Sequence, residues 1–247
     1  MKTPSLLSRR VLIVSSLLAT AAVAVPLVGS VAPSPPSALP PAGSTTTLRA
    51  LYGLQPPKQI DTARSALLLI DFQEEFFHGR LPLPDGPQAT FAARKLLNWA
   101  RRQGITVVHV NNEIKRPGSP VFAAGSPGAE GVSVLAATPN ERVLIKASGG
   151  AFTNTDLDEW LKARHVELVV VAGLMTHLAV QLTASDATVK GYRVVVAADA
   201  TATRDLPLGG LGTSIDHRTL QRAALASLGD RFADVMPVRD ILDLPRL

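Results

Sequence analysis

The chain alternates short apolar runs with longer amphipathic stretches. The apolar runs, rich in Val, Leu and Ile, predict strands buried on both faces over residues 65–71, 105–110, 142–146, 166–173, 192–199 and 232–237. Helical periodicity between them predicts helices over residues 87–103, 155–163, 178–190 and 216–228. This alternation predicts an α/β domain whose parallel sheet is covered by helices on both faces.

Local signals place several boundaries within this pattern. The stretch from Thr155 to Asp158 resembles a capping box at the start of one helix, and Gly191 suits the position just after the end of another. A further helix is expected to end at Gly229. The segment Glu113–Asn140 is rich in Gly and Pro and poorly periodic, so it predicts a long loop of the kind that often carries function.

The N-terminus looks like an export signal. Ser8-Arg9-Arg10-Val11-Leu12, followed by a mildly apolar run to about Val28, resembles the bacterial twin-arginine signal. We expect residues 1–32 to be the signal peptide, with cleavage after Ala24 or Ala32, residues 33–47 a Pro-rich linker, and residues 48–247 the domain. The protein is then periplasmic or extracellular and meets the membrane only during export. An uncleaved, membrane-tethering anchor is the alternative, because the run is close to spanning length.

Charge and cysteine content exclude several classes of protein. The net charge of +5 includes Lys2, Arg9 and Arg10, and residues 1–32 hold no acidic residue, so the rest carries +5 − 3 = +2. No dense basic run appears, which argues against a nucleic-acid partner. The absence of Cys excludes disulfides, thiolate metal sites and cysteine catalysis.

Polar residues follow three of the predicted strands. Asp71 ends the first strand region, Lys146 ends the third, and the turn Gly173–Ala179 follows the fourth. Ligands in open α/β sheets bind outside the carboxyl ends of the strands, so a carboxylate, an ammonium and helix N-terminal amides can converge there. Each also has a structural alternative: a turn residue for Asp71, an exposed strand end for Lys146, and helix caps for Thr176 and His177.

Several segments together resemble a known family. They are LLLIDFQEEF, GSPVFAAGSPGAEG, VLIKASGGAFTNTDLDEWL, VVVAGLMTHLAVQLTASDA and GYRVVVAADATATRD, with a likeness that continues through HRTLQRAALASLGDRFADV. The family is the isochorismatase-like hydrolases, also called cysteine hydrolases. The resemblance implies a three-layer αβα, Rossmann-like fold around a six-stranded parallel sheet, and assembly into homo-oligomers.

The resemblance also implies site residues. The family's catalytic Asp, Lys and Cys fall on Asp71, Lys146 and Ala179. Its oxyanion hole, made by backbone amides beside a cis peptide, falls on Met175 and Ala179. The positions expected to contact substrate are Gln73, Phe76, Phe152, Thr176 and His177. The metal-binding Asp-x-His…His pattern of nicotinamidases is not evident, and His177 has no second ligand at metal spacing, so we expect neither metal nor cofactor.

Ala at the nucleophile position leaves two functions open. Without a thiolate there is no thioester intermediate. One hypothesis is a hydrolase that acts on a small molecule through Asp71 and Lys146, with Asp71 either protonating a vinyl ether or activating a water. The alternative is a catalytically dead family member that serves as an exported small-molecule binding protein. The pKa of Asp71 does not decide between acid and base, because Lys146 lowers it and burial raises it. The segment Lys115–Gly131 is expected to shape the substrate site, and the substrate is not identified.

Overall fold

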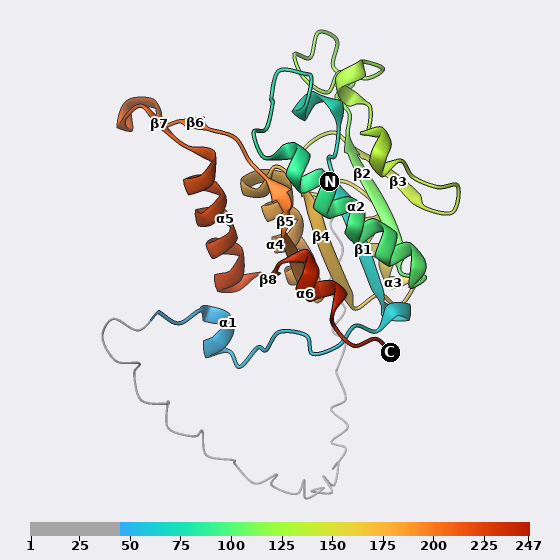
Figure 1. Cartoon of the computed structure of the whole chain (residues 1–247). Helices are drawn as coiled ribbons and strands as arrows, with labels where there is room; N and C mark the ends of the chain where they lie inside the picture. Colours follow the sequence, from blue (N-terminus) through green and yellow to red (C-terminus); the bar gives the residue numbers. More distant parts are fainter. Residues whose placement is uncertain (1–44) are drawn as a thin grey trace, which may run out of the picture. The chain divides into compact units, whose positions relative to one another are not determined.

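Six parallel strands form one sheet in the order β3-β2-β1-β4-β5-β8 (Figure 1). The computed structural model describes residues 45–247. The strands are β1 (Ser65–Ile70), β2 (Thr106–Asn112), β3 (Arg142–Lys146), β4 (Leu168–Leu174), β5 (Arg193–Ala202) and β8 (Asp234–Met236). The strand order reverses between β1 and β4, which makes the carboxyl ends of these two strands the expected place for a ligand. The predicted fold class is confirmed.

Helices cover both faces of the sheet, and each face has its own apolar core. On one side, α2 (Gly86–Arg102) and α6 (Val238–Leu242) pack on residues such as Leu67, Leu69 and Val170. On the other side, α3 (Leu157–Lys162), α4 (Gln181–Val189) and α5 (His217–Arg231) pack on the alternate positions, including Ala66, Leu68 and Val169. This division follows from the period of two along a strand, and it explains why the central strands are apolar throughout.

Gly173 allows the two central strands to approach closely at their carboxyl ends. It pairs with Ile70 in the β1–β4 register. A Cβ atom at Gly173 would lie 2.5 Å from the Ile70 Cβ and 2.6 Å from its carbonyl oxygen. No other residue type fits there without moving one strand away from the other.

Two helix boundaries differ from the sequence-based prediction. The capping box is wrong, because α3 begins only at Leu157 and its cap Asp156 makes no side-chain capping bond. The Thr155 hydroxyl donates to the Ala151 carbonyl at 2.6 Å and accepts from the Leu157 amide only at 3.4 Å. The predicted helix end at Gly229 is also wrong, since α5 continues to Arg231. A helix tolerates an isolated glycine at a cost of about 1 kcal/mol, which packing against the core offsets.

The helix predicted after β4 has a more complex start. Residues Thr176–Val180 form a π-helical turn, η5, and α4 follows it. The end agrees with the prediction, because Gly191 follows the helix with a left-handed φ of 93°.

The remaining described elements are short. They are α1 (Leu48–Leu51), β6 (Leu206–Pro207) and β7 (Ser214–Ile215), with 3₁₀ turns η1 (Thr62–Arg64), η2 (Glu74–Phe76), η3 (Pro127–Ala129), η4 (Ser133–Leu135) and η6 (Gly209–Leu211). No helix within residues 45–247 has both the length and the apolar character needed to cross a membrane. The predicted signal peptide and most of the predicted linker lie outside the described residues.

Candidate active site

Asp71 and Lys146 form a buried ion pair at the carboxyl edge of the sheet. The Lys146 Nζ donates to the Asp71 Oδ2 at 2.8 Å, and the two side chains are only 1% and 4% exposed. Asp71 follows β1 with a left-handed φ of 52°, a conformation that Asp adopts more readily than most residues. Burial raises the pKa of the Asp71 carboxyl to about 6, against the opposing effect of Lys146. This pair, separated by 75 residues in the sequence, is the centre of the site.

The turn after β4 brings the buried Ala179 to the same edge of the sheet. The Leu174–Met175 peptide that precedes the turn is cis. Thr183 fixes the turn to the segment beyond Lys146, because its hydroxyl donates to the Ala179 carbonyl at 2.7 Å and accepts from the Ala151 amide at 2.9 Å. Thr183 therefore joins Ala179 to the chain that leaves β3.

Buried polar atoms without a partner concentrate at this edge. Within residues 45–247 there are six such side-chain atoms, and two of them are Trp99 Nε1 and Gln221 Oε1. The other four lie at or just beyond the carboxyl ends of β1, β2, β4 and β5: Asp71 Oδ1, Asn112 Oδ1, Thr176 Oγ1 and Arg204 Nε. Leaving a buried polar atom unpaired costs about 1–3 kcal/mol, so such a concentration is typical of a site that a ligand completes.

The three expected pocket residues on other segments have specific partners. The buried Gln73 amide bonds the backbone of Asn112 at 2.7 and 2.8 Å and the Ala129 carbonyl at 2.8 Å. The Phe76 ring packs edge-on against Phe122, with ring centroids 5.3 Å apart. The Phe152 ring stacks on Tyr192 at 5.9 Å. Phe76 belongs to the core on the α2 face and Phe152 to the core on the α4 face, so the sheet edge lies between them.

Thr176 and His177 lie at the start of η5, next to the end of β5. Thr176 is fully buried, and the His177 Nδ1 is hydrogen-bonded to the Thr203 hydroxyl. Burial, and then the positive charge of Arg204, lowers the pKa of His177, which favours the neutral imidazole at pH values near 7. No ion pair in the described part of the chain includes Arg204, whose guanidinium bonds only the Asp205 carbonyl at 3.2 Å.

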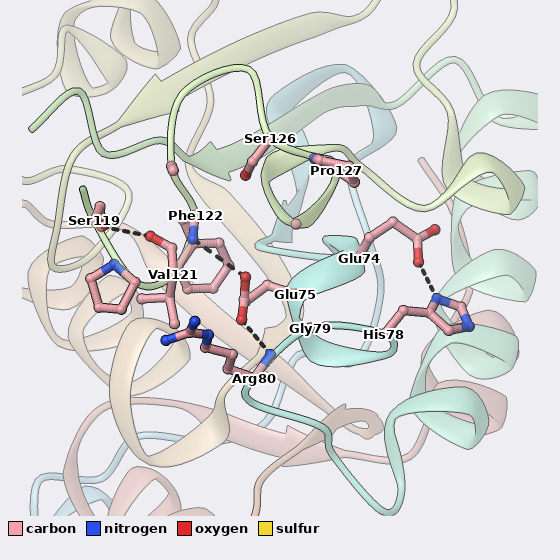
Figure 2. Close-up of a pocket in the computed structure, with 13 residues that line it drawn as sticks. Glu74, Glu75, His78, Gly79, Arg80, Ser119, Val121, Phe122, Ser126 and Pro127 are labelled. Carbon is pink, nitrogen blue, oxygen red and sulfur yellow. Dashed lines mark hydrogen bonds and ion pairs between the residues drawn. The ribbon is translucent and has the colours of Figure 1, made fainter. Parts of the chain in front are cut away.

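The long segment between β2 and β3 is fastened to the residues that follow Asp71. The Glu74 amide donates to the Glu130 carbonyl, and the Val132 amide to the Phe72 carbonyl, both at 2.9 Å. A cavity of about 290 Å³ lies between η2 and residues 119–128, and Figure 2 shows the residues that line it. The Glu75 carboxylate, which accepts from the Arg80 amide at 2.6 Å, lines this cavity, and Asp71, Lys146 and Ala179 do not. Glu75 also accepts from the Phe122 amide at 3.5 Å and so connects η2 to this segment.

Comparison with known proteins identifies the family. The isochorismatase domain matches residues 65–240, which is more than half of the 247-residue chain. The chain belongs to the isochorismatase family.

Relatives within this family have several activities. A secreted isochorismatase effector of Verticillium dahliae is 31% identical over 79% of this chain and 99% of its own length. A streptothricin hydrolase of Streptomyces noursei is 35% identical over 70% of this chain and 68% of its own length. The crystal structure of an isochorismatase hydrolase from Oleispira antarctica superposes with a TM-score of 0.70 at 32% identity, covering 74% of this chain and 98% of the other.

Two residues of this isochorismatase-family site were missed by sequence reasoning. Asn112 is the last residue of β2, and its polar character after the apolar run VVHV was the available signal. Arg204 lies just past β5 and forms no ion pair among the described residues. Among residues 45–247, no three His, Asp or Glu side chains gather in the way that a metal ion requires.

Proposed function

We propose that this isochorismatase-family protein is a hydrolase that acts on a small molecule through Asp71 and Lys146, without a covalent intermediate. One observation carries the proposal: the Asp71 carboxyl is buried, has one oxygen on Lys146 and one without a partner, and has a pKa raised to about 6. A pKa near the working pH is what a general acid or base needs. A purely structural ion pair would gain from pairing both oxygens.

In this mechanism the free oxygen of Asp71 acts as the base. Asp71 Oδ1 takes a proton from a water beside the Ala179 methyl, and the water oxygen bonds to the substrate carbonyl carbon. The oxyanion that forms is stabilised by the backbone amides of Met175 and Ala179, which need no side chain and are unaffected by the loss of Cys. The leaving group then departs with the proton held by Asp71. Lys146 keeps the carboxylate ionised and in position.

The second candidate is a binding protein, and Ala179 favours it. The site keeps the Asp71–Lys146 pair but has a methyl group where the family's amidases have a thiolate. Such a protein would bind a small molecule in the same place and release it unchanged.

Turnover by the wild type against Ala179→Cys separates the two functions. The domain is incubated with isochorismate and a panel of small amides, lactams and esters, and products are followed by mass spectrometry. We expect hydrolysis by the wild type. If the wild type hydrolyses none of the compounds while Ala179→Cys hydrolyses amides, the pocket is intact and lacks only its nucleophile. That result would overturn the hydrolase and favour the binding protein. The conservative control Ala179→Ser tests whether a hydroxyl at this position is enough for amide hydrolysis.

Arg204 points to an anionic substrate. Its charge has no counter-ion in the described chain, and its buried Nε has no partner. We expect Arg204→Gln to raise KM for succinamate about 10- to 100-fold, the effect of losing a charge-assisted hydrogen bond, with kcat little changed. The neutral analogue butyramide is the control, and its KM should not move. An equal rise in KM for both compounds would show that Arg204 supports the fold of the site rather than an anion.

We also propose export. The twin-arginine pattern at Arg9 and Arg10 supports it, as does the secreted relative in Verticillium dahliae. The expected substrate is therefore a small molecule met outside the cytoplasm.

A further inference from the structure

Asn112 shares a face of the sheet with Lys146. The two residues are partners in the parallel β2–β3 register, and paired residues of neighbouring parallel strands project to the same side. Val108 and Val110, which precede Asn112 on that side of β2, belong to the core that also contains Ala179. The Asn112 side chain thus extends this apolar row to the edge where Lys146 meets Asp71.

The backbone of Asn112 is held rigidly. Its amide donates to the Gln73 Oε1 at 2.7 Å, and its carbonyl accepts from the Gln73 Nε2 at 2.8 Å. Gln73 is itself fully buried. Because both backbone groups are paired, the backbone from which the Asn112 side chain projects is fixed before any ligand arrives, which contributes to the preorganisation that a selective contact requires.

The Asn112 Oδ1 is a buried acceptor without a partner. An N–H or O–H group of a bound molecule would supply the missing hydrogen bond to this oxygen. That donor belongs to a neutral group: the Asp71 carboxylate is already paired with Lys146, so a buried cation would have no counter-ion of its own. Amides and lactams carry a neutral N–H beside the scissile carbonyl, whereas esters and lactones do not.

We propose that Asn112 is a specificity-determining residue that accepts a hydrogen bond from the substrate N–H and so selects amides over the corresponding esters. This inference rests on the proposed function for its site and deepens it by naming the substrate class. When a buried acceptor in the site bonds an N–H of the substrate, an analogue without that N–H binds less well, because the acceptor then has no partner.

Matched pairs of compounds test the proposal. Succinamate is compared with monomethyl succinate, and pyrrolidinone with butyrolactone, by isothermal titration calorimetry on the wild type, Asn112→Leu and Asn112→Asp. Where a compound is turned over, the same ratio is taken from kcat/KM. We expect the wild type to prefer the amide or lactam about 10- to 100-fold. In Asn112→Leu, which removes the acceptor at similar volume, the preference should disappear. Asn112→Asp retains acceptor oxygens and should keep it.

The neighbouring Asn111→Leu is the matched control. Asn111 lies on the same strand, but its side chain points to the opposite face, so the amide-to-ester ratio should not change. Equal affinity of the wild type for amide and ester, or binding of neither member of either pair, overturns the proposal. If Asn111→Leu also loses the preference for amides, the effect comes from a disturbance of β2 and not from the Asn112 acceptor. That result would also overturn the proposal. If the amides bind selectively through Asn112 without being hydrolysed, the proposed hydrolase fails while this inference stands.

Discussion

Asp71→Asn is expected to lower kcat/KM of the wild-type reaction by about 10²–10⁴-fold, the usual contribution of a general acid or base. The substitution keeps the volume of the side chain and a hydrogen-bond acceptor for Lys146, but it removes the group that exchanges a proton. Substrate affinity should change little, so the loss should fall on kcat. Steady-state kinetics with the substrate found in the panel measure both values. A variant that loses affinity and keeps kcat would remove Asp71 from the chemistry.

The pH profile of the wild type shows which role Asp71 has. Burial raises the pKa of this carboxyl to about 6 in the folded protein. If Asp71 is the base, kcat/KM rises as the pH increases through about 6 and then levels off, because the ionised form is active. If it is the acid, kcat/KM falls over the same interval. Lys146→Met removes the cation that favours ionisation and should move the inflection to higher pH. An inflection that stays in place in this variant would assign it to another group.

The same raised pKa has a consequence for stability. The folded state binds a proton more tightly than the unfolded state, where an Asp titrates near its ordinary value of about 4. The contribution of Asp71 to stability is therefore most favourable below that value and decreases as the pH rises through about 6. At neutral pH the buried Asp71 carboxylate therefore lowers the stability of the folded state.

The sequence predicted the layers of the fold well because burial on both faces produces a strong signal. Continuous apolar runs such as LLLI and VVVA are typical of central strands. The helices between such strands then cover the two faces of the sheet. The boundary at Gly229 failed because packing overrode the local preference of glycine, and the boundary at Thr155 failed because its side chain forms a local bond with the preceding chain. The Thr155 hydroxyl found the Ala151 carbonyl, and the helix α5 ran through Gly229 to Arg231.

The site was partly predictable. The carboxyl ends of parallel strands share an edge, and Asp71, Lys146 and Ala179 lie at or after such ends. The partners of individual polar atoms were beyond reach, because they depend on strand register. Gln73 was expected to line the pocket, yet its amide bonds the backbone of Asn112 and Ala129, and whether it also meets a substrate stays a prediction. Asn112 itself became visible only when its register with Lys146 and its unpaired oxygen were known.

Gly173→Ala is expected to destabilise the domain by about 3 kcal/mol or more, at the upper end of what overpacking costs. The added Cβ would lie 2.6 Å from the Ile70 carbonyl oxygen and 2.5 Å from its Cβ, and the central strands cannot separate without disturbing both cores. For a domain of this size the loss corresponds to a fall in Tm of about 6–12 °C, measurable by calorimetry.

Gly210→Ala is the matched control, because its added Cβ would meet nothing within 4 Å. Its Tm should stay close to that of the wild type. The substitution should also affect activity, because Gly173 lies close to two parts of the candidate site. It precedes η5 on β4, and it pairs with the residue before Asp71. Any separation of β1 from β4 therefore moves the η5 turn, with Ala179, away from the Asp71 carboxylate. Gly173→Ala should lose activity at temperatures where it is still folded, and full activity with an unchanged Tm would refute the close approach of these strands.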